Sequence, residues 1–246
     1  MELKILGSSS KGNCYILDNG NEALVIECGI VFKEVQKAMG FAISRIAGAI
    51  VSHEHGDHAK YVQKFTDAMI PCYMSTGTMK GAKMNDNAMV HAMEEHVIYN
   101  IGSYKVQPFA TQHDSNQPFG FLIFHPECGN VLFATDTYYL KYTFEGLNNI
   151  LLECNYSQDI LDENVRAGKL PKALRERTMK SHCSYDTCKE ILLSNDLSGV
   201  HNIVLIHLSD GNSNAMQFQQ GIKEATHKVV SIAKSGMVIN FNKSPF

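Results

Sequence analysis

Short stretches rich in apolar residues, broken by turn residues, follow one another along the first part of the chain, which predicts strands. Such stretches cover residues 2–6, 14–18 and 23–28. Asn19-Gly20 separates the second stretch from the third and is a strong hairpin signal. Helical spacing then predicts a helix over 31–39, and an apolar run predicts a buried strand over 45–51. The chain therefore opens as a β-meander and reaches a buried strand just before residue 52.

Further along the chain, stretches with the periodicity of a strand are interleaved with stretches that have the periodicity of a helix. The next predicted elements are a helix over 58–67 and strands over 70–74, 96–101, 103–110, 119–125 and 130–135. The last predicted elements are helices over 157–167, 171–179, 184–194 and 213–226 and strands over 202–206 and 236–241. Strands interleaved with helices in this way predict an α/β fold in which sheets pack on sheets, with the helices outside.

Composition is ordinary for a soluble protein. The 246 residues are 44% hydrophobic and 19% charged, and no Pro/Gly/Ser-rich linker divides them, so we expect a single domain over 1–246. The N-terminal stretch turns polar at Ser8, and no segment approaches about 18 uninterrupted apolar residues, which disfavours secretion and membrane spanning. The seven cysteines are dispersed and form no Cys-x-x-Cys pair, which favours free thiols in a cytoplasmic protein.

Eleven histidines are the informative excess, because neutral imidazole is the commonest protein ligand for transition metals. Six consecutive residues, His53-Glu54-His55-Gly56-Asp57-His58, place three imidazoles and a carboxylate in one loop after the strand predicted over 45–51. A lone histidine is usually an ordinary polar residue, but four ligand-type side chains at this spacing favour a metal site. The His-Glu-x-x-His helix of zincins is absent from this run.

A complete metal site needs further ligands, and rigid strand ends are suitable places for them. His113 follows the strand predicted over 103–110, Asp136 follows that over 130–135, and His207 follows that over 202–206. The sequence therefore predicts a composite site of histidines and carboxylates. Such donors accommodate zinc, manganese and iron alike.

This order of ligands resembles that of the metallo-β-lactamase superfamily. The resemblance implies a four-layer αββα sandwich of two mixed β-sheets flanked by helices, and two bound divalent metal ions, with Zn²⁺ expected first and Mn²⁺ or Fe as alternatives. It also implies one metal on His53, His55 and His113, a second on Asp57, His58 and His207, and Asp136 as the bridge between them. The usual aspartate of the superfamily at the end of the third strand is Glu27 here.

A narrower similarity is to the YycJ/WalJ branch of the superfamily, whose members are regarded as DNA exonucleases. It is carried by Gly7-Ser8-Ser9-Ser10-Lys11-Gly12-Asn13-Cys14, by His113-Asp114 followed by Pro118-Phe119-Gly120-Phe121, by Glu153-Cys154-Asn155-Tyr156, by His207-Leu208-Ser209 and by the segment 161–184. The branch motif Gly-His-Leu-Ser stands in this chain as Ser181-His182-Cys183-Ser184.

His182 has two interpretations of equal weight. In related ribonucleases of the superfamily the corresponding histidine protonates the leaving group, so the resemblance implies that His182 is a general acid. The residues themselves equally fit a position just before a helix whose N-cap is Ser184. In the first interpretation His182 is catalytic together with Asp57 and Asp136, which hold the metals that activate water.

The residues that could contact a substrate lie in two segments of the chain. Six basic residues lie close together before His182 with one acid, Glu176, and can steer a phosphate backbone or simply form a solvated helix face. The loop over 8–13 can hold a phosphate oxygen on its backbone N–H groups, or be only a turn. The candidate substrate-binding residues are Ser10, Asn13, Lys172, Arg175 and Arg177.

Three function classes follow. The leading hypothesis is a dinuclear phosphodiesterase or nuclease that cleaves DNA through a metal-activated water. The alternative enzyme is a small-molecule phosphodiesterase or lactonase on the same ligands, because fold and ligands alone leave the substrate open. The third class is a noncatalytic protein that binds nucleic acid on a metal-stabilised fold. The net charge of −3 argues against a uniformly basic surface but allows a local basic patch.

Overall fold

The computed structural model describes residues 1–244, in which fourteen strands form two seven-stranded sheets. The first sheet, in the order β14-β1-β2-β3-β4-β5-β6, contains β1 (Glu2–Ser9), β2 (Gly12–Asp18), β3 (Ala23–Ile26), β4 (Ile46–Ile50), β5 (Cys72–Ser75), β6 (Val90–Met93) and β14 (Met237–Asn240). The second, in the order β13-β12-β11-β10-β9-β8-β7, contains β7 (Tyr99–Ile101), β8 (Tyr104–Ala110), β9 (Phe119–His125), β10 (Gly129–Ala134), β11 (Leu147–Glu153), β12 (Asn202–Ile206) and β13 (Val229–Ile232).

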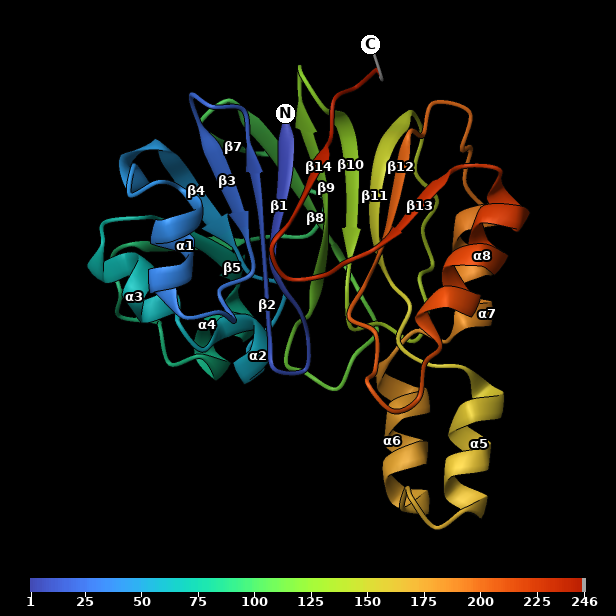
Figure 1. The fold of residues 1–246 in the computed structure, drawn as a ribbon. Coiled ribbons are helices and arrows are strands. Elements are labelled where there is room, and N and C mark those ends of the chain that lie inside the picture. Colours follow the sequence, from blue (N-terminus) through green and yellow to red (C-terminus); the bar gives the residue numbers. More distant parts are fainter. Residues whose placement is uncertain (245–246) are drawn as a thin grey trace.

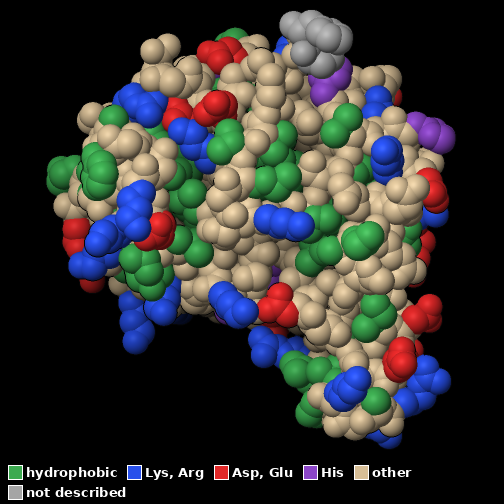
Figure 2. All heavy atoms as spheres, in the orientation of Figure 1, with side chains coloured by type: hydrophobic (Ala, Val, Ile, Leu, Met, Phe, Trp, Pro, Cys, Tyr) green, Lys and Arg blue, Asp and Glu red, His purple; other side chains and the backbone are tan. Residues whose placement is uncertain are grey.

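All of the α-helices except α5 and α6 cover the outer faces of the two sheets (Figure 1). The α-helices are α1 (Phe32–Ala38), α2 (Gly56–Ala59), α3 (Val62–Asp67), α4 (Thr76–Gly81), α5 (Gln158–Arg166), α6 (Lys172–Ser181), α7 (Tyr185–Leu193) and α8 (Ala215–Thr226). The first four lie on the side of the first sheet, and α7 and α8 lie on the side of the second. Helices α5 and α6 project from the body as a hairpin, and Figure 2 shows several Lys and Arg side chains on it.

The four layers follow from strands that bury both faces. Along β2, Tyr15 and Leu17 belong to the core between the two sheets, whereas Cys14 and Ile16 belong to the core under α1 and α3. Successive side chains of a strand point to opposite faces, so the run of apolar residues over 14–17 packs into two cores. Another core, which includes Phe218, lies between the second sheet and helices α7 and α8. The expected αββα sandwich is confirmed.

Both sheets are mixed, and their parallel parts position the site. Strands β3 to β6 run parallel to one another, as do β10 to β13. Neighbouring parallel strands end at the same edge of a sheet, so residues that follow them come together. Glu27 and Ser52 follow β3 and β4 closely, and Asp136, Glu153 and His207 lie at the ends of β10, β11 and β12.

Some sequence predictions need correction. The helix predicted over 58–67 is two helices, because the chain turns at Tyr61, whose N–H donates to the Cys28 carbonyl. The strand predicted over 96–101 is shorter and begins at Tyr99, after His96 adopts a φ of 65°. Strands β6, β11 and β13 and helix α4 were not predicted.

The seven cysteines are buried and unpaired, as expected of free thiols. In the part of the chain that the structure describes, no helix combines the length and apolar character needed to cross a bilayer.

Candidate metal centre

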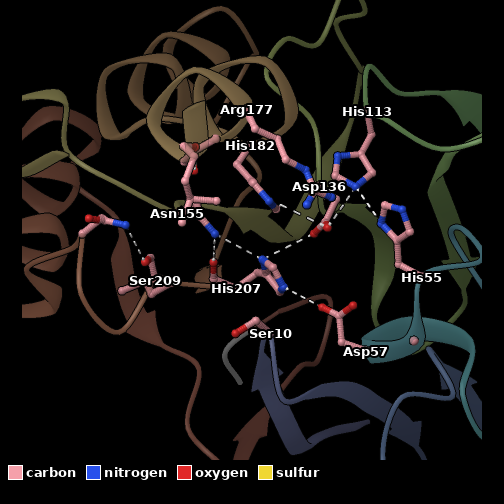
Figure 3. Close-up of a pocket in the computed structure, with 15 residues that line it drawn as sticks. Ser10, His55, Asp57, His113, Asp136, Asn155, Arg177, His182, His207 and Ser209 are labelled. Carbon is pink, nitrogen blue, oxygen red and sulfur yellow. Dashed lines mark hydrogen bonds and ion pairs between the residues drawn. The ribbon is translucent and has the colours of Figure 1, made fainter. Parts of the chain in front are cut away.

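Ligand-type side chains from six segments that are distant in sequence meet at one edge of the sandwich (Figure 3). Three groups have their potential ligand atoms within 4.8 Å of one another: His53, His55, His113 and Asp136; Asp57, His58 and His207; and Asp136, Glu153, His182 and His207. All seven residues predicted as metal ligands belong to these groups. Their side chains therefore share one place in the fold, although their roles as ligands remain a prediction.

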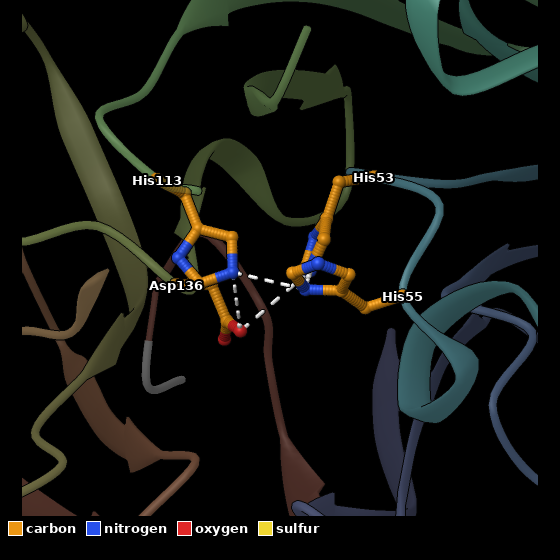
Figure 4. Close-up of side chains that lie close together, drawn as sticks. All are labelled: His53, His55, His113 and Asp136. Atoms are coloured by element: carbon orange, nitrogen blue, oxygen red, sulfur yellow. Dashed lines mark hydrogen bonds and ion pairs between the residues drawn. The ribbon is translucent and has the colours of Figure 1, made fainter. Parts of the chain in front are cut away.

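The first group is built around three imidazoles (Figure 4). His55 Nδ1 lies 3.0 Å from His53 Nε2 and 3.1 Å from His113 Nε2. Two ligands bound at about 2.0–2.1 Å to a tetrahedral zinc ion lie about 3.3–3.4 Å apart, so this spacing is close to that of a zinc coordination shell. Burial lowers the pKa of His53 and of His113, which favours the neutral imidazole that binds metals. This donor set fits a divalent cation.

The outer nitrogens of these rings are held by polar neighbours. His113 Nδ1 lies 2.7 Å from the Ser181 carbonyl oxygen, and an acceptor there requires Nδ1 to carry the proton. The Nε2 lone pair of His113 then faces the other imidazoles. His53 Nδ1 lies 2.9 Å from Ser52 Oγ. Such outer partners fix the tautomer and orientation of metal-binding histidines, so the site is preorganised.

The second group contains Asp57 and two imidazoles. Asp57 Oδ2 lies 3.3 Å from His58 Nε2 and 3.2 Å from His207 Nε2. Burial alone raises the pKa of Asp57, but the hydrogen bonds to His207 and His58 hold that pKa well below its usual range. Asp57 is therefore ionised at neutral pH, as a metal ligand must be.

Asp136 lies between the two groups. Its Oδ2 is 3.4 Å from His113 Nε2 and 3.5 Å from His58 Nε2, and its Oδ1 is 3.4 Å from His207 Nδ1. Burial raises the pKa of this carboxyl, but His207 and His58 outweigh that effect and hold the pKa well below its usual range. A buried carboxylate whose two oxygens face different histidines has the position that a bridging ligand requires.

Three residues at strand ends adopt unusual backbone conformations. Glu27, Asp136 and His207 have φ values of 70°, 45° and 54°, in the left-handed region that side chains other than glycine rarely adopt. Glu27 and His207 follow β3 and β12 directly, and Asp136 stands two residues after the end of β10. Such strain persists only where the surroundings enforce it, and it clusters at functional sites. Here it turns three buried polar side chains toward the same centre.

Glu27 supports the loop over 53–58 despite being one methylene longer than the aspartate usual in the superfamily. Its Oε1 accepts a hydrogen bond of 3.2 Å from the Ser52 N–H, and its Oε2 lies 3.3 Å from His58 Nδ1. Glu27 and His58 are both fully buried. The longer carboxylate therefore reaches both ends of the loop over 53–58.

Glu153 belongs to the candidate site, although the sequence pointed to it only as part of the motif Glu153-Cys154-Asn155-Tyr156 and assigned it no role. Its Oε1 lies 2.7 Å from His182 Nδ1 and 3.3 Å from His207 Nδ1, and it is fully buried. Its Oε2 accepts hydrogen bonds from the backbone N–H groups of Thr137 and Cys183. Burial lowers the pKa of His182, but Glu153 outweighs burial and the pKa of His182 is raised.

Both interpretations of His182 find support in the geometry. Ser184 accepts a hydrogen bond from the Thr187 N–H and caps α7, as the local pattern predicts. The His182 side chain lines the pocket beside Asp136 and His207 (Figure 3). The residue is therefore both adjacent to a helix start and directed into the candidate site.

The pocket over this centre has a volume of about 430 Å³. Of the five candidate substrate-binding residues, Ser10 and Arg177 line it. Asn13 is buried beneath it, with Nδ2 3.2 Å from His58 Nε2. Lys172 and Arg175 line a separate hollow, and Arg175 pairs with Asp162 across the helical hairpin. The structure therefore does not bring Lys172 and Arg175 to the pocket, because they lie on the other face of α6.

Comparisons with known proteins agree with this geometry. The family described as Metallo-beta-lactamase superfamily matches residues 9–72, which include the loop over 53–58. Exodeoxyribonuclease YycJ of Bacillus anthracis is 24% identical over 237 residues, covering 87% of this chain and 84% of that protein. Exodeoxyribonuclease WalJ of Streptococcus pneumoniae serotype 2 (strain D39 / NCTC 7466) is 24% identical over 240 residues, covering 91% and 84%.

Among solved structures, the metallo-beta-lactamase fold protein YhfI from Bacillus subtilis superposes with a TM-score of 0.73. It covers 97% of this chain and 99% of its own, at 16% sequence identity. The likeness at this identity concerns the fold, which is shared almost from end to end. The matched segment, the relatives that span most of the sequence and the shared fold make the chain similar to the metallo-β-lactamase superfamily.

Proposed function

We propose that the chain is a dinuclear phosphodiesterase that cleaves DNA. The observation that carries this proposal is the convergence of three imidazole nitrogens, two aspartates and two further histidines beside the His182–Glu153 pair. The first metal would be held by His53, His55 and His113, the second by Asp57, His58 and His207, and both by Asp136. Zinc is the expected ion, and manganese or iron is compatible with the same donors.

Two cations bound there would lower the pKa of a water molecule toward about 7 and stabilise negative charge on the phosphate oxygens. The protein supplies the remaining functions. Glu153 engages Nδ1 of His182, so that Nε2 is the atom free to carry a proton to the leaving oxygen. Asp57 and Asp136 stay ionised and keep the donor atoms in place. Proton donation of this kind contributes about 10²- to 10⁴-fold to the rate.

DNA is the proposed substrate for two reasons. The relatives that span most of the chain are named exodeoxyribonucleases. A basic side chain, Arg177, reaches the pocket from the hairpin of α5 and α6, and phosphate contacts dominate the affinity of nucleic-acid-binding proteins. We also propose that the protein acts in the cytoplasm, in keeping with its seven free cysteines.

The test is incubation of metal-loaded protein with end-labelled single- and double-stranded DNA. We expect cleavage by the wild type and none by Asp136→Ala. Lys64→Gln serves as the matched control, because Lys64 is exposed and pairs only locally with Asp67. Parallel panels of chromogenic phosphodiesters and lactones identify the alternative, a small-molecule hydrolase. Intact DNA after loading with zinc, manganese and iron in turn would overturn the proposal.

A further inference from the structure

One face of α6 forms a wall of the pocket. Leu174, Arg177 and Thr178 line the pocket, and they stand at positions i, i+3 and i+4 of the helix. One turn further, the Ser181 carbonyl contacts the His113 ring. Among the described residues that line this pocket, Arg177 is the only lysine or arginine. The helix therefore presents a single cation to the candidate metal centre.

Arg177 is held at the rim by an acid. Its Nε donates to Asp114 Oδ2 over 2.9 Å, and Asp114 Oδ1 lies 3.3 Å from His113 Nε2. The side chains of Arg177 and Asp114 are 64% and 42% exposed. The guanidinium is thus solvated, next to a ligand residue of the first group, and paired with a single carboxylate.

A second cation stands at another part of the same rim. Lys11 lies in the turn between β1 and β2, and its Nζ is 3.2 Å from Asp210 Oδ2 in the loop that follows β12. The pocket is lined by Ser10 on one side of this ion pair and by Ser209 and Asn212 on the other. The Lys11–Asp210 pair therefore joins two loops that form the pocket mouth.

These two pairs differ from the local ion pairs within single helices. The pairs of Lys37 with Glu34 and of Lys64 with Asp67 each link residues three apart in one helix. The Lys11 and Arg177 pairs instead join residues that are 199 and 63 positions apart. Exposed ion pairs contribute only about 0–1 kcal/mol, whereas phosphate oxygens form strong charge-assisted hydrogen bonds. A phosphate can therefore replace either aspartate at little cost.

The size of the cavity indicates which phosphates of a DNA strand would reach Lys11 and Arg177. A volume of about 430 Å³ lies within the range of sites for small ligands. A strand that places one nucleotide in the cavity must leave its neighbouring phosphates on the rim. We propose that Lys11 and Arg177 form a phosphate clamp, which binds the phosphates of a single DNA strand on the two sides of the phosphate at the metal centre. This inference rests on the proposed function.

The test compares Lys11→Gln, Arg177→Gln and the double variant with the wild type and with Lys64→Gln. Binding of a fluorescent oligothymidylate with phosphorothioate linkages, which retain the negative charges, is followed by anisotropy over a series of KCl concentrations. Each lost contact to a single strand lowers the slope of log affinity against log salt by about 0.7. We expect that decrease in each single variant and about twice as much in the double variant, with no decrease in Lys64→Gln.

Cleavage of the ordinary oligothymidylate is measured in parallel. We expect the clamp variants to raise KM more than they lower kcat, because their contacts exist before and during the reaction. Salt slopes of Lys11→Gln and Arg177→Gln that equal the wild-type slope would overturn the clamp, whether or not DNA is cleaved. Absence of cleavage by the metal-loaded wild type would overturn the proposed function instead. A salt slope that decreases in Arg177→Gln but not in Lys11→Gln would show that Lys11 binds no phosphate, and would overturn the two-sided clamp.

Discussion

Replacement of His182 by glutamine separates proton donation from metal binding. Glutamine can still donate a hydrogen bond to Glu153, whose Oε1 lies 2.7 Å from His182 Nδ1, but it has no proton to give to a leaving group. Glu153 is fully buried, and a partner that remains avoids the about 1–3 kcal/mol cost of an unsatisfied buried group. The variant should therefore fold normally and lose only the chemistry.

The size of the expected rate loss in His182→Gln follows from the role of His182 as a general acid. Loss of a general acid lowers the rate about 10²- to 10⁴-fold, which corresponds to about 3–5 kcal/mol of transition-state stabilisation. That loss applies to DNA, whose leaving oxygen must take up a proton. A substrate such as thymidine 5′-(4-nitrophenyl) phosphate releases nitrophenolate, which needs no proton. We therefore expect a much smaller effect of His182→Gln on the chromogenic diester than on DNA.

The assay compares kcat/KM of wild type and variant on both substrates, with metal content and melting temperature measured on the same samples. His201→Ala is the matched control, because His201 precedes β12 at the end opposite to His207. Equal losses on the two substrates would refute the acid role. Loss of a metal ion in His182→Gln would instead identify His182 as a ligand, since its Nδ1 lies 4.0 Å from Asp136 Oδ2.

Three further predictions concern the stability of the centre and the state of the thiols. Glu27→Ala should weaken metal binding about 10- to 100-fold, as loss of an outer-shell partner does, and unchanged affinity by titration calorimetry would contradict the role of Glu27. Removal of metal with EDTA should lower the melting temperature, since a ligand at 100 times its Kd adds about 2.7 kcal/mol, and superimposable melting curves of stripped and reloaded protein would contradict a bound cation. None of the seven cysteines should react with Ellman's reagent in the native protein and all should react after denaturation, because all are buried; a rapidly reacting native thiol would disprove this burial.

The sequence could predict the candidate ligands because each of them follows a recognisable local pattern, a ligand-type residue just after an apolar run. His113, Asp136 and His207 each follow an apolar run, and strands of a sheet bring such positions together. Glu153 follows the same pattern at the end of β11, but the run over 147–153 was not identified as a strand. Its two asparagines interrupt the apolar pattern, and Asn149 is buried because its side chain donates to two backbone carbonyls of the fold.

Substrate contacts were harder to predict because they depend on helix orientation. The basic stretch before His182 is a single feature of the sequence, but 3.6 residues per turn divide it between two faces. Arg177 faces the pocket, and Lys172 and Arg175 face a separate hollow. Similarly, Lys11 is placed at the pocket mouth by its ion pair with Asp210, which is 199 positions away in the sequence. Neither relation can be read from spacing along the chain.

The most direct test of the account is anomalous diffraction from crystals grown with zinc, collected at the zinc edge. The account predicts two anomalous peaks per chain, one among His53, His55 and His113 and one among Asp57, His58 and His207, with Asp136 in contact with both. Peaks confined to other parts of the surface, with these side chains left without metal, would contradict it.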